Sequence, residues 1–265
     1  ASAVDITLDS MNTIVVTDGY GDQDTLVSIE GLMGTAFNDK LTGDGFDNVL
    51  KGLGGADTLK GLAGNDLLEG GDGDDILEGG DGDDVLDGGA GADSLDGGDG
   101  NDSTSYATAL AGLTIDLVNA GNSTGDAAGD TFTSVEVITA SNFDDIMIGD
   151  ATANVLNGLK GNDEIHAGAG NDVLNGGAGA DLLDGGDDID TATYATAVAV
   201  SNRTGEGVTV NLADSLQNTG EATGDTFVSI ENVTGSSFND TLVGDGNDNV
   251  LSGGKGDDFL VGGAG

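Results

Sequence analysis

A nine-residue period constrains this chain more than any other feature of its sequence. Aspartates recur at every ninth residue from Asp57 to Asp102, and again from Asp163 to Asp190. A leucine or isoleucine stands two residues after most of them, as Leu59 does after Asp57, and a glycine-rich run precedes each one. Nine residues is the period of neither an α-helix nor collagen. It suits a six-residue turn followed by a three-residue strand.

The residue types at each place in the period predict how a nonapeptide folds. Glycine readily adopts the positive φ angles that so tight a turn needs. In the short strand the side chains alternate, so the leucine points inwards while its two neighbours point outwards. Two nonapeptides then form one eighteen-residue coil, with one strand on each wall of a flattened stack. We therefore predict an all-β fold, a parallel β-roll or β-helix solenoid.

A longer repeat lies above the nonapeptides, because residues 24–39, 130–145 and 225–240 have similar sequences. The interval from Asp24 to Tyr106 exceeds the interval from Asp130 to Tyr194 by two nonapeptides, which is one full coil. This difference supports the coil length independently of any family. It also predicts an organisation into partial coils at 1–23, repeat units at 24–129 and 130–224, and a truncated third unit at 225–265.

The spaced aspartates predict metal sites between stacked turns. Neighbouring turns on one edge lie about 4.8 Å apart, so their carboxylates repel one another unless a cation lies between them. Calcium takes six to eight oxygen ligands from carboxylates and carbonyls, whereas magnesium prefers octahedral geometry and keeps its waters. The predicted ligands are Asp39, Asp57, Asp66, Asp75, Asp84, Asp93, Asp102, Asp145, Asp163, Asp172, Asp181, Asp190, Asp240 and Asp258. Pairing them suggests roughly six to nine Ca²⁺ ions, with weak or empty positions at Asn48, Asn154 and Asn249.

The nonapeptide resembles that of the repeats-in-toxin (RTX) family, which reads G-G-x-G-x-D-x-(apolar)-x. The resemblance is close over residues 52–105 and 158–193, and returns over 253–265. It implies a right-handed parallel β-roll with calcium bound between the turns. It also implies secretion as an unfolded chain through the type I channel of a Gram-negative bacterium, followed by folding in external calcium.

The composition excludes several other classes of protein. The chain has no cysteine and one histidine, His166, so it lacks the usual ligands of a zinc or iron–sulfur site. Its formal net charge of −43 repels nucleic acid and anionic lipid, and no apolar stretch is long enough for membrane insertion. Residues 1–9 do not have the pattern of an N-terminal signal peptide.

A search for catalytic residues predicts that the chain is not an enzyme. A nucleophilic serine needs a positioned base, and His166 occupies an outward place in its nonapeptide. Each close pair of carboxylates belongs to a repeated turn, whereas an active site is normally unique. The equivalent residues Phe37, Phe143 and Phe238 are expected to cap the core, and Tyr106 and Tyr194 to close the arrays.

These observations predict an extracellular or cell-surface structural protein that folds on binding calcium, of the surface-layer, filament or adhesin-stalk type. The alternative is the folding and secretion region of a type I-secreted enzyme or toxin. The chain ends at Gly265 within a nonapeptide, so we expect a segment of a longer protein. An ice- or carbohydrate-binding role has less support, because no flat threonine array or aromatic platform is visible.

Self-assembly is the other expected interaction, either lateral or end to end. Val49, Leu67 and Val85 occupy the first strand place in alternate nonapeptides and point outwards from one wall. Such an exposed apolar row is consistent with contact between copies of the chain. Strand propensity alone also explains it, because β-branched and aliphatic residues favour strands.

Overall fold

The structure is a computed structural model that describes residues 2–8, 14–17, 23–26, 28–198 and 205–265. These residues form short β-strands and a few short 3-10 turns, with no α-helix among them. The chain divides into two compact units, residues 1–105 with 119–137, and residues 106–118 with 138–265. In the described ranges no helix is long and apolar enough to span a membrane.

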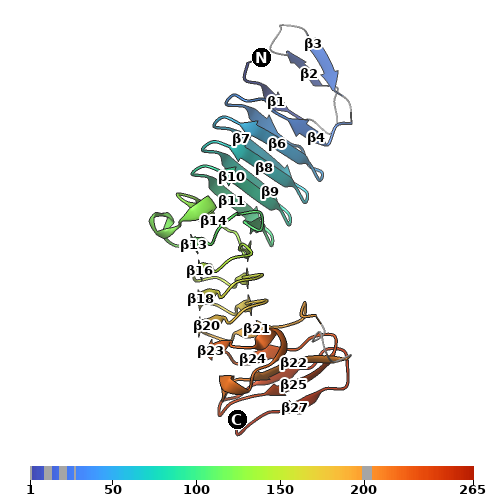
Figure 1. The fold of residues 1–265 in the computed structure, drawn as a ribbon. Helices are drawn as coiled ribbons and strands as arrows, with labels where there is room; N and C mark the ends of the chain where they lie inside the picture. The colour runs from blue at the N-terminus through green and yellow to red at the C-terminus, as the bar shows by residue number, and fades with distance from the viewer. Residues whose placement is uncertain (1, 9–13, 18–22, 27, 199–204) are drawn as a thin grey trace. The chain divides into compact units, whose positions relative to one another are not determined.

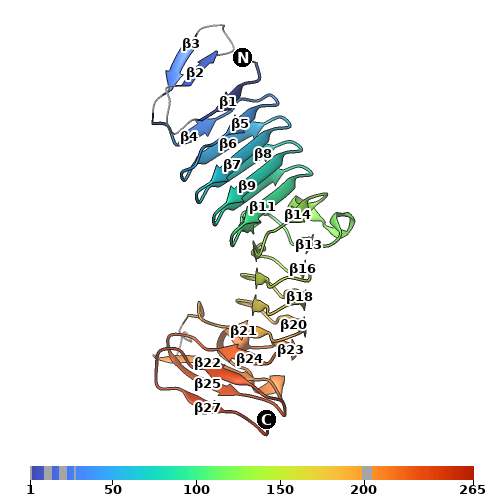
Figure 2. The same ribbon diagram turned by 180° about the vertical axis from the view of Figure 1, so that it is seen from behind.

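The first unit contains two parallel sheets that form opposite walls of a stack (Figures 1 and 2). One wall has the order β1 (Asp5–Thr7), β5 (Lys40–Thr42), β7 (Thr58–Ala63), β9 (Ile76–Asp81), β11 (Ser94–Asp99) and β14 (Thr131–Thr133). The other has β4 (Gly31–Met33), β6 (Val49–Gly54), β8 (Leu67–Asp72), β10 (Val85–Ala90) and β12 (Ser103–Ser105). An antiparallel pair is formed by β2 (Ile14–Thr17) and β3 (Gln23–Leu26).

The second unit repeats this arrangement and adds a third sheet. One wall has the order β13 (Thr114–Asp116), β16 (Ile146–Ile148), β18 (Glu164–Ala169), β20 (Leu182–Asp187) and β23 (Thr226–Val228). The other has β15 (Val137–Thr139), which begins at the unit boundary, β17 (Val155–Asn157), β19 (Val173–Asn175), β21 (Thr191–Thr193), β24 (Asn232–Thr234) and β26 (Val250–Ser252). The third sheet contains β22 (Glu206–Asn211), β25 (Asn239–Val243) and β27 (Phe259–Val261).

The strand register confirms the predicted length of one coil. Leu68 of β8 pairs with Leu86 of β10, two nonapeptides later, and both strands run parallel. The strands are longer than predicted, because pairing continues into the turn, where Gly71 lies beside Gly89. Stacked turns of identical shape keep their backbones in hydrogen-bonding distance, so the ladder does not stop where the leucine-containing segment ends.

The core is a column of aliphatic side chains, one from each strand of a coil. Burial of one such side chain contributes about 1.5–3 kcal/mol, so the column is a large share of what holds the coils together. Its members are at most 1% exposed: Leu41, Leu50, Leu59, Leu68, Leu77, Leu86, Leu95, Leu156, Ile165, Leu174 and Leu183.

Some apolar residues do not lie where the sequence pattern places them. Leu260 of β27 is in the period but is 46% exposed. The expectation that Phe37 and Phe143 cap the core is wrong, because these side chains are 47% and 45% exposed. They stand in turns, whose side chains point away from the column. Tyr106 and Tyr194 are buried, as expected for residues that close the arrays.

The connecting segments 119–130 and 213–225 each contain two short 3-10 turns. These are η1 (Ala120–Asn122), η2 (Gly125–Ala127), η3 (Ser215–Gln217) and η4 (Gly220–Ala222). Oδ1 of Asn119 accepts from the N–H of Gly121 at 3.2 Å, and Oδ1 of Asp214 accepts from Leu216 at 3.3 Å. Such side-chain caps explain why an asparagine or an aspartate precedes the first 3-10 turn of each segment. In Figure 1 the first of them protrudes beside β14.

Candidate metal centres

A ladder of buried aspartates runs along the turns of each array. Within an array, the backbone N–H of a frame aspartate, meaning the acid of the nine-residue period, donates to Oδ1 of the frame aspartate one coil later. Asp57 donates to Asp75 at 2.7 Å and Asp75 to Asp93 at 2.8 Å. In the second unit Asp163 donates to Asp181 at 2.9 Å. The donor is always in the earlier coil, so the ladder has a direction.

The second oxygen of these carboxylates has no such partner. In the described residues, Oδ2 is buried without a hydrogen-bond partner in Asp57, Asp66, Asp75, Asp84, Asp93, Asp102, Asp163, Asp172, Asp181 and Asp190. Leaving a buried acceptor unpaired costs about 1–3 kcal/mol, and more for a charged group. Ten such oxygens in regular order indicate that another group completes these turns.

A backbone carbonyl lies beside the unpaired oxygen in seven of these turns, those of Asp57, Asp66, Asp75, Asp84, Asp102, Asp163 and Asp190. The point where a Cβ on Gly52 would lie is 2.2 Å from Oδ2 of Asp57 and 2.6 Å from the carbonyl oxygen of Gly70. Glycine at the first residue of the turn keeps the space between the two oxygens free, and in the turn of Asp172 alanine, Ala167, stands in this place. Carboxylate and carbonyl oxygens are the ligands that calcium prefers. The residues present therefore fit a calcium ion, which supplies the positive charge that these oxygens lack.

The second residue of the turn determines where the backbone N–H groups point. In the arrays it has a positive φ, as in Gly71 at 112° and Gly80 at 123°. Leucine occupies the same place in three turns and is forced into the same left-handed region, with φ of 81° at Leu53, 89° at Leu62 and 71° at Leu159. We call a turn of this kind an open turn.

Three of the predicted ligands belong to turns of another kind. Oδ2 of Asp145 accepts from the backbone N–H of Ser141 and from its hydroxyl, both at 2.8 Å. Asp240 accepts in the same way from Ser236, and Asp39 from Thr35. Their second turn residues do not have a positive φ. Both oxygens are thus hydrogen-bonded by protein groups, because Oδ1 of Asp145 also accepts from Leu113. We call these closed turns.

The three asparagines of the frame also lie in closed turns. Oδ1 of Asn48 accepts from the N–H of Asp44 at 2.7 Å, and Asn154 and Asn249 accept likewise from Asp150 and Asp245. Each repeat unit therefore begins with two closed turns in succession, one on each edge, and open turns follow. Asp258 lies in an open turn, since Gly254 before it has a φ of 85°, but the residue is only partly buried.

Burial in the metal-free fold raises the pKa of the ten frame carboxyls whose Oδ2 has no partner. The pKa rises from 3.8 to about 7 for Asp93 and Asp163, mainly because burial disfavours the charged form. The neighbouring carboxylates of the ladder add to it, such as Asp130 beside Asp93 and Asp181 beside Asp163. A divalent cation reverses both causes, because it compensates the lost hydration and screens the repulsion between stacked acids.

Four acids of the connecting segments take part in the same ladder and were missed by the sequence analysis. Oδ1 of Asp130 accepts from Asp93, and Oδ1 of Asp225 from Asp181. The carboxylates of Glu136 and Glu231 accept from the N–H groups of the last frame aspartates. The nine-residue spacing does not reach them, but the alignment of the long repeats does, because it places all four at equivalent positions.

A second ladder outside the first was also missed. The residue before each frame acid is often Asn or Asp, and its Oδ1 accepts from the N–H one coil later. Asn65 accepts from Asp83 at 3.1 Å, and Asp83 from Asn101 at 3.0 Å. This ladder runs in the opposite direction to that of the frame aspartates. It explains why the fifth turn residue is so often an amide or an acid, which a metal site alone does not require.

In the described part of the chain, no three acidic, histidine or cysteine side chains come together as a metal cluster. A site between two coils needs only one or two carboxylates, since carbonyls supply the other oxygens.

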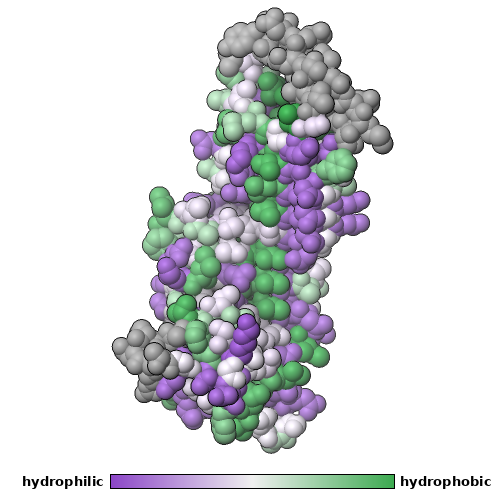
Figure 3. All heavy atoms as spheres, turned by 90° about the vertical axis from the view of Figure 1, so that its right-hand side faces the viewer, coloured by the Kyte–Doolittle hydropathy of each residue, from purple (hydrophilic) through white to green (hydrophobic). Residues whose placement is uncertain are grey.

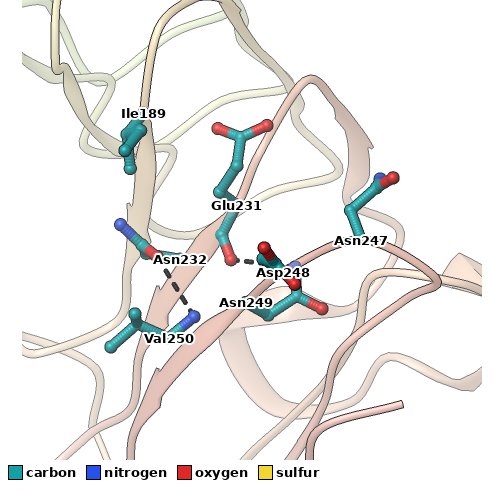
Figure 4. A pocket seen from close by; sticks show the side chains of 7 residues that line it. All are labelled: Ile189, Glu231, Asn232, Asn247, Asp248, Asn249 and Val250. Atoms are coloured by element: carbon teal, nitrogen blue, oxygen red, sulfur yellow. Dashed lines mark hydrogen bonds between the residues drawn. The ribbon is translucent and has the colours of Figure 1, made fainter. Parts of the chain in front are cut away.

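A cavity of about 370 Å³ lies in the second unit and is lined by Ile189, Glu231, Asn232, Asn247, Asp248, Asn249 and Val250. Figure 4 shows the Glu231 side chain between those of Ile189 and Asn247.

Comparison with known proteins identifies the repeats. A family model described as the RTX calcium-binding nonapeptide repeat matches residues 33–68, 69–103, 130–165, 139–174, 157–192 and 234–265. No curated protein matches the chain. The family matches cover more than half of the sequence and contain every open turn, which confirms the resemblance seen in the sequence. The chain belongs to the RTX calcium-binding nonapeptide repeat family.

Proposed function

We propose that this chain is an extracellular structural protein that folds on binding calcium, of the surface-layer, filament or adhesin-stalk type. The observation that supports it most is the row of ten buried Oδ2 atoms without hydrogen-bond partners. The oxygens repeat along both arrays, as a scaffold requires, rather than converging on one place, as a catalytic centre does. The proposed role is therefore that of a scaffold and not of an enzyme.

The proposed mechanism is a transition from disorder to order. A formal charge of −43 and a core one side chain thick keep the metal-free chain expanded. For an ion at ten times its dissociation constant, binding to the folded form alone adds about 1.4 kcal/mol of stability per site. Extracellular calcium-binding modules have dissociation constants for calcium of about 10⁻⁴ to 10⁻³ M. Secretion as an unfolded chain from a Gram-negative bacterium, followed by folding outside, is consistent with this behaviour.

An outward apolar row supports the structural role over that of a secretion tail. Val49 and Val85 are 38% and 43% exposed, and both lie beside Leu67 in the sheet register. In Figure 3, apolar side chains form a column flanked by hydrophilic ones on the face shown. Such a column offers a surface for lateral contact between copies of the chain once calcium has ordered the coils.

Two measurements test the proposal. Circular dichroism during a calcium titration is expected to show β-structure appearing with calcium and disappearing with excess chelator. β-structure that persists unchanged in chelator contradicts calcium-dependent folding. Electron microscopy of the calcium-loaded chain is then expected to show sheets or filaments. Single particles that fold with calcium but never associate favour the alternative role, the folding region of a secreted enzyme or toxin.

A further inference from the structure

The last frame aspartate of each array lies against a connecting segment instead of another nonapeptide. Asp102 ends the array of the first unit and Asp190 that of the second, and both residues are 0% exposed. Oδ2 of each is buried without a hydrogen-bond partner, as in the arrays. The segment that stacks directly on each of them is not a glycine-rich turn, so the group that completes these two carboxylates must come from a connecting segment.

A serine of the connecting segment supplies the carbonyl that a glycine supplies in the arrays. The Cβ point on Gly97 lies 2.4 Å from Oδ2 of Asp102 and 2.1 Å from the carbonyl oxygen of Ser134. The Cβ point on Gly185 lies 2.3 Å from Oδ2 of Asp190 and 2.3 Å from the carbonyl oxygen of Ser229. Within the array, the Cβ point on Gly61 is 2.1 Å from a carboxylate oxygen and 2.7 Å from a carbonyl.

The backbone of these serines is held in a conformation that serine rarely adopts. Ser134 and Ser229 both have a φ of 47°, in the left-handed region. Side chains disfavour this region, and strain of this kind persists only where the surrounding structure requires it. The same conformation occurs in both units, at the residue whose carbonyl faces the unpaired oxygen. The direction of that carbonyl is thus a reproduced feature of the fold.

A glutamate takes the place of the next frame aspartate. Oε2 of Glu136 accepts from the N–H of Asp102 at 2.9 Å, and Oε2 of Glu231 accepts from Asp190 at 3.0 Å. The segment from Ser134 to Glu136 is shorter than the six-residue turn it stacks on, and it carries a glutamate where the arrays carry an aspartate. The longer side chain of glutamate brings the carboxylate within hydrogen-bonding distance of the N–H of the last frame aspartate. Figure 4 shows the Glu231 carboxylate pointing away from Asn249.

We propose that these residues form two further divalent-cation sites, one at the end of each array. Oδ2 of Asp102, the carbonyl of Ser134 and the carboxylate of Glu136 hold one calcium ion. Asp190, Ser229 and Glu231 hold the other. The inference rests on the proposed calcium-dependent function and extends it from the nonapeptides to the connecting segments, which thereby become part of the metal-binding structure.

The test compares calcium stoichiometry in matched variants of the full chain. The variant Glu136→Gln/Glu231→Gln removes both charges, while each glutamine still offers an oxygen to the same backbone N–H. Asp5→Asn/Asp126→Asn removes two exposed acids that lie outside the turns of the frame aspartates and serves as the control. Bound calcium is measured by equilibrium dialysis with elemental analysis, and folding by circular dichroism at saturating calcium.

We expect the glutamine variant to bind two fewer ions per chain than the wild type, and the control to bind the same number. An unchanged stoichiometry in the folded glutamine variant overturns the proposal, because it leaves the glutamates a hydrogen-bonding role only. Wild-type chain that binds no calcium refutes the proposed function itself, which is a distinguishable result.

A second measurement does not depend on whether the variant folds. Crystals of the wild-type chain grown with terbium, a calcium substitute, give an anomalous signal at each occupied site. A peak beside the carbonyl oxygens of Ser134 and Ser229 supports the proposal. Peaks restricted to the glycine-rich turns, with none at these two carbonyls, overturn it.

Discussion

The backbone N–H of Asp75 donates to Oδ1 of Asp93, which lies one coil later in the chain, at 2.8 Å. This bond leaves Oδ2 of Asp93 buried and without a hydrogen-bond partner. One oxygen of each frame carboxylate thus joins two coils, while the other remains for a cation. A single residue type therefore serves both the stacking of the roll and its dependence on metal, so the two properties change together.

Open and closed turns are expected to differ in calcium binding. Asp163→Asn replaces a carboxylate whose Oδ2 has no partner, whereas Asp145→Asn replaces one that Ser141 already satisfies. The first variant is expected to lose bound calcium. At a calcium concentration ten times the dissociation constant, it should also lose about 1.4 kcal/mol of folding stability. The second is expected to keep the wild-type stoichiometry. Calorimetric titration with calcium measures both, and equal losses contradict the distinction between the two turns.

A methyl group in place of Gly70 is expected to weaken one site, although the turn of Asp172 holds Ala167 at the equivalent place. In Gly70→Ala the Cβ lies 2.3 Å from Oδ2 of Asp75 and 2.6 Å from the carbonyl of Gly88, so the turn must distort. We expect a loss of bound calcium and a destabilisation of about 1–3 kcal/mol, as for other overpacked sites. Gly45→Ala is the control, because no atom lies within 4 Å of its Cβ position. Denaturant unfolding in calcium compares them, and equal effects refute the prediction.

Relief of backbone strain is expected to stabilise the roll. Leu62 has a φ of 89° and its side chain is 48% exposed, so Leu62→Gly removes strain and little packing. The left-handed conformation costs about 1–2 kcal/mol for a residue with a side chain, and the entropy of glycine offsets about 0.5–1 kcal/mol. A net gain of about 0.5–1 kcal/mol should appear in thermal unfolding. The exposed Leu110, which lacks a positive φ, provides the control variant Leu110→Gly, which should give no gain.

Acid is expected to stabilise the metal-free fold. Because burial raises the pKa of Asp93 and Asp163 from 3.8 to about 7, the folded form binds protons in this interval that the unfolded chain has released. Stability in chelator therefore rises as the pH falls from about 7 towards 4. Circular dichroism in chelator should show more β-structure at pH 5 than at pH 7.5. Calcium affinity should decrease as the pH falls, because protons compete with calcium for the same carboxylate oxygens.

Whole coils are expected to be removable, but half coils are not. Deleting residues 70–87 removes one full coil and keeps every later strand on its own wall, as the pairing of Leu68 with Leu86 indicates. Deleting residues 70–78 alone exchanges the walls for the rest of the first unit, so β10 meets β7 in place of its own partner β8. The longer deletion should fold in calcium with fewer ions bound, and the shorter one should lose stability. Nuclear magnetic resonance spectra of both variants provide the comparison.

The regular part of this fold was predictable because its sequence repeats at the structural period. The leucine column and the pairing of Leu59 with Leu77 follow from a nine-residue alternation in which each coil has the same environment. The length of the strands was not predictable in this way. It depends on backbone pairing through Gly71 and Gly89, which the identity of the side chains does not encode.

The sequence period also does not predict which frame aspartates have an unpaired oxygen. Asp145 and Asp163 occupy the same place in the period, and the sequence analysis treated them alike. The difference lies in the second turn residue, where Ser141 bonds the carboxylate while Leu159 adopts a positive φ. Glu136 and Glu231 were missed because a shortened turn removes them from the period, although their side chains reach the same ladder. The assignment of the fourteen aspartates as ligands stays a prediction.

The direction of the aspartate ladder makes each coil depend on the coil that follows it in the chain. Since each donor lies in the earlier coil and its acceptor in the later one, the N–H of Asp57 is bonded only where the turn of Asp75 is folded. The two ends of an array therefore differ in what they need from their surroundings. The N-terminal end offers carboxylate oxygens, whereas the C-terminal end presents backbone amides that other acids must accept from, as Glu136 does from Asp102.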